Sequence, residues 1–270
     1  MDAWLILLPA FTVSALMIFT HTYLGLHVLE RGIIFIDLAL AQVAALGLSI
    51  AFLMGHEAHG PDAQLYAFVA TLLAALGFAK LRQIPGKIAR EVTIGCVYVV
   101  ATALSIVILS LSSQGMTELK ALFNGNILWT NWDEIAIIGA AYAALTVLHV
   151  IYRRRFLALS FEPEAAKRPS LMWEFFFFAS FAVTITLAVN VAGILLVFAF
   201  LIIPGFSASM IARSFPMRLA LGWLFGMAGT IAGLWFSFAG DLPTGATVVS
   251  ALGALPIIAA VMKMALGRRA

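Results

Sequence analysis

Two polar residues interrupt an otherwise apolar stretch at residues 33 to 54, IIFIDLALAQVAALGLSIAFLM. These are Asp37 and Gln42, and their carboxylate and amide oxygens are ligand types that suit hard divalent cations. A carboxylate in hydrocarbon costs at least about 3 kcal/mol, so such an acid normally faces a protein interior or an aqueous path. The competing interpretation places Asp37 near the membrane interface or in a helix–helix hydrogen bond. Asp37 is the first functional candidate.

A second group of metal-ligand types follows in the segment GHEAHGPD, residues 55 to 62. His56, Glu57, His59 and Asp62 are ligand types for zinc or similar ions, and histidines three residues apart can chelate one ion on a helical turn. Polar loops of this kind are also commonly just solvated. These residues therefore form either a site at the outer face that binds and collects metal ions or an ordinary solvated loop.

The elements that must position these side chains are membrane helices. Of the 270 residues, 63% are hydrophobic and 11% are charged, and the mean hydropathy is +1.05. A helix over residues 33 to 54 would extend roughly 33 Å, enough to cross a bilayer core. The chain is therefore predicted to be an all-α, polytopic membrane helix bundle that forms a single domain, 1–270. Hydropathy separates nine apolar segments: 3–24, 33–54, 65–80, 91–111, 134–152, 172–189, 192–212, 219–238 and 245–266. The sixth and seventh form either two helices or one broken helix, so we expect eight or nine crossings.

The basic residues predict the orientation of this bundle. With the N-terminus outside, the inner segments contain 15 of the 16 lysines and arginines, and only Lys120 lies outside. This asymmetry follows the positive-inside rule and predicts an N-out, C-in protein. It also explains the basic isoelectric point without a nucleic-acid partner.

The longest inner loop covers residues 153 to 171. Ser160 is expected to cap a short helix there, with Glu162 and Pro163 in its first turn. Such a helix on the inner surface can dock in the groove of a partner, or it can simply connect two spans. The two interpretations remain open on these residues.

Two further patterns mark the second half of the chain. Pro204 and Gly205 lie inside an apolar span, where they are expected to kink or break a helix. Asp241 is expected at the outer boundary, before Pro243 and Gly245 open the last helix. An acid at that place is favourable near a helix N-terminus.

Several function classes lack their sequence patterns. The nucleotide-binding pattern GxxxxGK[ST] and the metalloprotease pattern HExxH are absent. A haem subunit would need paired histidines on facing helices, whereas His21, His27 and His149 are scattered and lie near the ends of the spans. An ion-coupled carrier would need more acids within its spans than Asp37. We therefore expect a transport protein that is not itself an enzyme and that obtains any nucleotide chemistry from a partner.

Four stretches carry a resemblance to a known family. They are GIIFIDLALAQVAALG, ELKALFNGNILW, FEPEAA leading to NVAGILLVFAFLIIPGFSAS, and DLPTGATVV. In this order they resemble the membrane subunit of metal-ion ABC transporters, the ABC-3 family of zinc, manganese and iron uptake permeases. The resemblance implies a homodimer with its path between two copies, cytoplasmic ATPase subunits and an extracytoplasmic metal-binding protein. The loop with Phe161, Glu162, Pro163 and Glu164 resembles the coupling helix that contacts the ATPase.

This chain departs from the family at its second helix. The family typically has Gly-Asp-x-x-Ser-His there, and its Asp and His resemble metal ligands. Aligned on Gly47, the chain has Gln42 in place of the His and Leu38 in place of the Asp, with Asp37 one residue early. An amide oxygen with a carboxylate suits manganese better than zinc, copper or nickel.

The resulting prediction is the permease subunit of an ABC importer in the inner (plasma) membrane, surrounded by lipid. The expected cargo is a divalent metal, zinc first by family frequency, then manganese or iron, and no cofactor is expected to be bound by this chain. The alternatives are a permease for a chelated metal or another substrate, and an ion-coupled secondary carrier.

Overall fold

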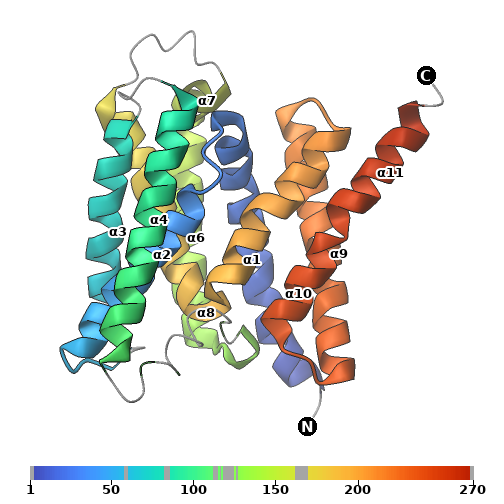
Figure 1. The fold of residues 1–270 in the computed structure, drawn as a ribbon. Coiled ribbons are helices and arrows are strands. Elements are labelled where there is room, and N and C mark those ends of the chain that lie inside the picture. The colour runs from blue at the N-terminus through green and yellow to red at the C-terminus, as the bar shows by residue number, and fades with distance from the viewer. Residues whose placement is uncertain are drawn as a thin grey trace. The chain divides into compact units, whose positions relative to one another are not determined.

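The structure, a computed structural model, describes residues 3–57, 60–81, 86–111, 115, 117, 125, 127–161 and 170–267. Helices and their connections account for these residues, and no strand occurs among them. The helices, labelled in Figure 1, are α1 (Ala3–Arg31), α2 (Ile36–Leu53), α3 (Pro61–Leu81), α4 (Lys87–Ser110), the 3-10 helix η1 (Ile127–Trp129), α6 (Trp132–Ile151), α7 (Arg153–Phe161), α8 (Leu171–Ile211), α9 (Phe215–Gly240), α10 (Thr244–Gly253) and α11 (Leu255–Gly267). The all-α prediction is confirmed.

Eight helical stretches of the described chain are long and apolar enough to cross a membrane. The sixth is α8, which covers both the sixth and the seventh predicted segments. A straight helix of 41 residues would extend about 60 Å, twice the thickness of a bilayer core. Its backbone leaves helical geometry at Gly193, where φ is 75° and ψ is 161°. Glycine adopts this positive φ readily, so one position divides α8 into two lengths that each suit one crossing.

The helix break at Gly193 lies at the division that the sequence predicted between the sixth and seventh segments, 172–189 and 192–212, so the alternative of one broken helix is confirmed. The separate break expected at Pro204 and Gly205 is not seen. Pro204 and Gly205 both lie inside helical α8. Their environment indicates a packing role: Gly205 faces Leu26 of α1, and Pro204 approaches Gly222 and Gly226 of α9. The break therefore occurs at the glycine that adopts a positive φ, and the helix continues through the proline.

The chain forms two compact units, and α1, α6 and α8 each continue from one into the other. The first unit consists of residues 1–29, 124–143 and 191–270, and the second of residues 30–123 and 144–190. The prediction of a single domain over 1–270 stays a prediction.

In the first unit, the glycines of α9 allow close helix packing. A Cβ at Gly226 would lie 2.7 Å from Cγ2 of Ile18 in α1, and one at Gly233 would lie 2.5 Å from Cα of Val248 in α10. Small residues at such spacing bring membrane helices into close contact. Figure 1 shows the start of α1 and the end of α11 at opposite ends of this unit. Termini on opposite sides agree with an odd number of crossings, although which side is inside stays a prediction.

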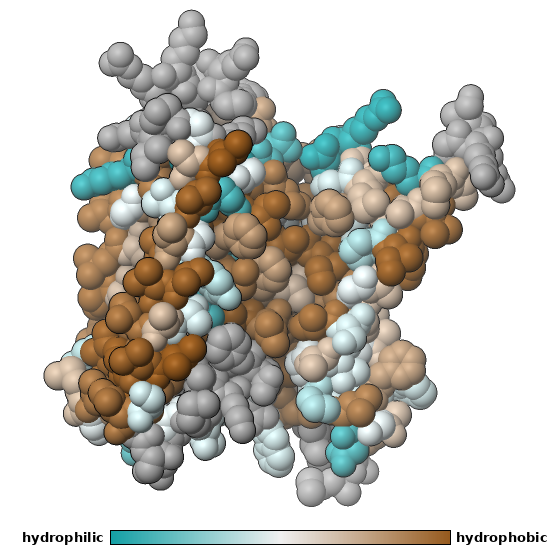
Figure 2. Space-filling view, in the orientation of Figure 1, coloured by the Kyte–Doolittle hydropathy of each residue, from teal (hydrophilic) through white to brown (hydrophobic). Residues whose placement is uncertain are grey.

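The second unit is built around α2, which packs against both α3 and α4. Most of α2 is buried, and Gly47 brings it close to α3 because a Cβ there would lie 2.7 Å from Cα of Ala67. A buried hydrogen bond of 3.0 Å joins the hydroxyls of Thr71 in α3 and Thr186 in α8. The outward sides of α3 and α4 are apolar, as the brown surface of Figure 2 shows, and Val99 is 60% exposed. This surface suits contact with lipid.

The end of α9 and the start of α10 follow the sequence prediction closely. Asp241 ends α9 in the left-handed conformation, with φ at 50°. Pro243 precedes the first residue of α10, and Gly245 lies in its first turn. The hydroxyl of Ser237 lies 2.7 Å from that of Thr244, which ties the two helices together at this corner.

Close packing of α2 on α3 predicts opposite effects for two glycine substitutions. Gly47→Ala should lower the free energy of unfolding by about 1 kcal/mol or more, because the added methyl group overlaps the backbone of α3. The matched control is Gly95→Ala in α4, where no atom lies within 4 Å of an added Cβ. Alanine favours a helix over glycine, so this control should keep or slightly raise stability. Thermal denaturation in detergent measures both, and equal midpoints for the two variants would contradict the packing account.

Candidate functional site

The N-terminus of α2 is held by a side chain from another helix. After α1 ends at Arg31, the chain turns at Gly32, where φ is 65°, and α2 begins at Ile36. The backbone N–H of Phe35 donates a 3.0 Å hydrogen bond to Oε1 of Glu91 in α4. A carboxylate at this place complements the helix dipole and satisfies a backbone donor. Asp37, in the first turn of α2, is thus not required as a cap.

The side chain of Asp37 is buried and has no hydrogen-bond partner in the described part of the chain. The residue is 1% exposed, and both carboxylate oxygens are unpaired. The expected alternative of a helix–helix hydrogen bond is therefore not seen among these residues. A buried carboxylate without a partner is costly unless a cation or a polar ligand satisfies it. The two oxygens of Asp37, which have no donor among the described residues, are available as ligands for a cation.

Gln42 is also buried, with 1% exposure, and its amide nitrogen has no partner among the described residues. Residues five apart on an ideal helix are separated by about 140° around its axis. Asp37 and Gln42 therefore do not face one ion from the same straight helix. Nowhere in the described ranges do three or more His, Cys, Asp and Glu side chains gather as a metal site would require. One chain offers individual ligands along α2 and no full coordination shell in these ranges.

The second group of candidate ligands is brought together only in part. Nδ1 of His56 lies 3.2 Å from Oδ2 of Asp62, and the His56 ring lies beside Tyr66. Glu57 is exposed, and its carbonyl oxygen accepts a hydrogen bond from the N–H of Gly60. His59 lies outside the described residues. The metal-collecting role of this segment stays a prediction.

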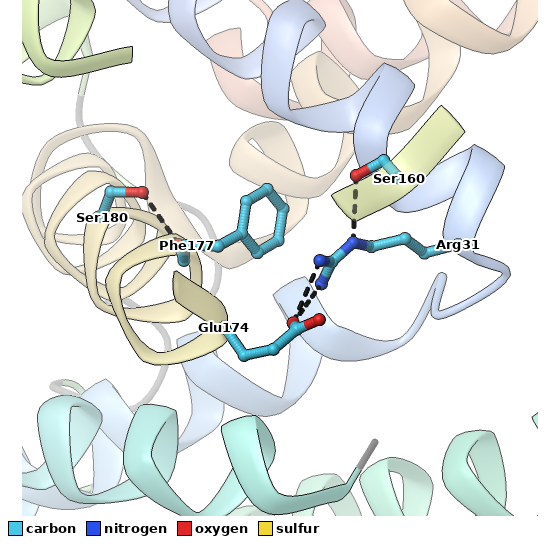
Figure 3. Close-up of polar contacts among 5 residues, drawn as sticks. All are labelled: Arg31, Ser160, Glu174, Phe177 and Ser180. Atoms are coloured by element: carbon cyan, nitrogen blue, oxygen red, sulfur yellow. Dashed lines mark hydrogen bonds and ion pairs between the residues drawn. The ribbon is translucent and has the colours of Figure 1, made fainter. Parts of the chain in front are cut away.

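A buried ion pair joins Arg31, at the end of α1, to Glu174, in the first turn of α8. Both terminal nitrogens of Arg31 donate to Oε2 of Glu174, each at 3.0 Å, and Nε donates to the hydroxyl of Ser160, also at 3.0 Å (Figure 3). The side chains are 7% and 2% exposed. The guanidinium carbon also lies 4.1 Å from the centre of the Phe177 ring. Three helices therefore meet at one cation.

Sequence reasoning missed this cluster. It counted Arg31 only as an inner basic residue, and it did not consider Glu174, although a lone acid in the run MWEFFFF was a signal. A cavity of about 100 Å³ adjoins the cluster. Its charged lining consists of Glu30, Arg31, Arg90 and Glu174.

The expected coupling loop is described only at its edge. Phe161 is the last residue of α7, while Glu162, Pro163 and Glu164 lie outside the described residues. Ser160 lies inside α7 and not at a helix N-terminus, so its predicted capping role is wrong. The reason is the apolar spacing of Phe156 and Leu159, which with Ser160 form one buried helical face and extend the helix to this point.

Comparisons with known proteins show the family of this chain and a solved structure of similar fold. A family model described as the ABC 3 transport family matches residues 4–263. The manganese transport system membrane protein MntC of Halalkalibacterium halodurans is 25% identical over 230 residues, 84% of this chain and 76% of that protein. A protein of Haemophilus influenzae named "Probable iron transport system membrane protein" is 26% identical over 256 residues, 94% of this chain and 90% of that protein. The structure of PsaBC from Streptococcus pneumoniae in complex with Fab has a similar fold, with a TM-score of 0.76 at 20% identity, covering 94% of this chain and 90% of that one.

Breaking the buried ion pair should destabilise the protein more than removing it entirely. Glu174→Gln leaves the Arg31 cation buried without its counter-ion, and the expected loss of stability is about 3 kcal/mol. The double variant Arg31→Met with Glu174→Met removes both charges, so its loss should be smaller. Thermal and denaturant unfolding in detergent measure the difference, with Glu57→Gln at an exposed acid as the control. A Glu174→Gln protein that unfolds like the wild type would contradict the role of the pair.

Proposed function

The chain belongs to the ABC 3 transport family, and on that premise we propose that this multi-pass membrane permease carries a divalent metal ion into the cell, with manganese or iron(II) preferred over zinc. The observation that carries the proposal is Asp37, a buried acid on a membrane-spanning helix with both oxygens unpaired among the described residues. A structural acid in such a place would be expected to have a protein donor. An acid on a cation path needs its oxygens free.

The preference for manganese or iron(II) has two supports. Relatives of this chain bear the names of manganese and iron transport proteins. Gln42, where the family pattern has His, offers an amide oxygen in place of an imidazole, and oxygen ligands favour harder ions. Zinc, which family frequency placed first, stays an untested alternative.

The proposed permease works with partners. The sequence lacks the nucleotide-binding pattern, so we assign ATP hydrolysis to separate cytoplasmic subunits. Asp37 and Gln42 point in different directions from α2, so a second copy of the chain, related by two-fold symmetry, would supply further ligands around one ion. An extracytoplasmic metal-binding protein would deliver the ion at the outer face.

Removing the charge of Asp37 should impair transport without unfolding the protein. Asp37→Asn keeps the size of the side chain and needs no counter-ion, so folding and assembly with the ATPase should persist. We expect the initial rate of ATP-dependent manganese uptake into proteoliposomes to fall roughly tenfold, the factor for losing about 1.4 kcal/mol of ion binding. The control is Asp133→Asn, at an exposed acid in the first turn of α6. Uptake at the wild-type rate would remove Asp37 from the path.

Restoring the family imidazole should change which ion is preferred. In Gln42→His, a nitrogen ligand replaces the amide, and imidazole binds zinc better than it binds manganese. The ratio of zinc uptake to manganese uptake, measured in competition in the same vesicles, should therefore rise. The matched control is Gln64→His, which adds a histidine on α3 at a position that is not buried. If Gln42→His leaves the ratio at its wild-type value, Gln42 does not select the ion.

A further inference from the structure

The helix α7 lies directly before the expected coupling loop, and one of its faces is buried in the second unit. Phe156, Leu159 and Ser160 are at most 5% exposed, whereas the three arginines at the start of the helix are exposed. Residues at this spacing lie on one side of a helix. The helix is therefore attached along its buried face, and its last residue, Phe161, is also the first residue of the expected coupling segment.

Arg31 is one of the attachments of α7. Its guanidinium is planar and presents donors along different edges. One edge contacts Ser160, 129 residues away in the chain, and the other contacts Glu174, 143 residues away. The face of the group lies over Phe177. Figure 3 shows Ser160 and Glu174 bound to this one planar group. A movement of α7 that displaces Ser160 therefore acts on the ends of α1 and α8 through the guanidinium of Arg31.

A second attachment lies on the same face of α7. The ring of Phe156 stacks on His149 of α6, with centroids 3.9 Å apart and planes 12° from parallel, and packs edge-on against Trp173 of α8. Nε2 of His149 lies 2.9 Å from the hydroxyl of Ser180, which donates to the carbonyl oxygen of Phe177. The two attachments thus meet at Phe177, whose ring lies under Arg31. The buried face of α7 is therefore held at two points.

The position of Arg31 connects this cluster to Asp37. Arg31 is the last residue of α1, and α2 begins at Ile36 after a short turn. A shift of the Arg31 side chain and of the end of α1 therefore acts directly on the first turn of α2, where Asp37 lies. The hydrogen bond from Phe35 to Glu91 fixes this turn to α4.

We infer that Arg31 is the positioning residue that transmits the movement of the coupling loop from α7 to the helix that carries Asp37. The inference rests on the proposed function, because it requires an ATPase that moves the loop. It goes beyond that function by assigning the link to one hydrogen bond, from Nε of Arg31 to Ser160. Cutting this bond should weaken the coupling of ATP hydrolysis to transport while leaving the buried ion pair with Glu174 in place.

The test substitutes Ser160 by alanine in the full permease, assembled with its ATPase and metal-binding protein in proteoliposomes. The measured quantity is the amount of manganese moved per ATP hydrolysed. In Ser160→Ala this ratio should fall about fivefold, the factor for one hydrogen bond, while ATP hydrolysis stays close to the wild type and thermal stability falls no more than in a control that also loses one buried serine hydrogen bond. The matched control is Ser105→Ala in α4, a buried serine of the same unit whose hydroxyl bonds to the carbonyl of Ala101 in its own helix.

The outcomes separate the two claims. An unchanged ratio in Ser160→Ala, or an equal fall in Ser105→Ala, would overturn the transmitting role of Arg31. A parallel loss of hydrolysis, transport and stability would also overturn it, since the contact would then only brace the fold. A wild-type protein that moves no manganese with ATP would overturn the proposed function itself, and the transmitting role with it.

Discussion

The free energy of placing a charged acid inside an apolar helix bundle is the constraint on which the rest of this protein depends. Asp37 is buried on α2 with both oxygens unpaired in the described part of the chain, and the neighbouring backbone donor at Phe35 is satisfied by Glu91 instead. An acid in this condition gains most from a cation that arrives from outside the protein. Asp37 is also 1% exposed, so the helices around it keep lipid away from the carboxylate.

A second charged group shows the opposite solution to the same problem. Arg31 is almost fully buried, but its donors contact Glu174 and Ser160 and its face covers Phe177. A charge satisfied in this way fixes the helices that meet around it, whereas the oxygens of Asp37 have no partner among the described residues. The two residues lie on either side of one short turn between α1 and α2. The proposed transport cycle depends on that turn, because it joins α1, which ends at Arg31, to α2, which carries Asp37.

Sequence reasoning predicted the fold class well, because hydropathy and span length determine membrane helices strongly. It also selected Asp37, because an acid in an apolar span is conspicuous. It divided α8 near Gly193 correctly, because polar and small residues interrupt the apolar run there, but it expected a further break at Pro204, where the helix continues. The Arg31–Glu174 pair was missed because its partners are 143 residues apart and only the folded chain brings them together. The unpaired state of the Asp37 oxygens was likewise invisible in the sequence, since it depends on where every neighbouring donor lies.

The most direct test of this account is metal uptake by the wild-type permease in proteoliposomes with its ATPase and metal-binding protein. Manganese, iron(II), zinc and a chelated metal would be compared, each with ATP and without it. The account predicts ATP-dependent uptake of the bare ion, with manganese or iron(II) ahead of zinc. Uptake that proceeds without ATP, or a system that moves only the chelated form, would contradict it.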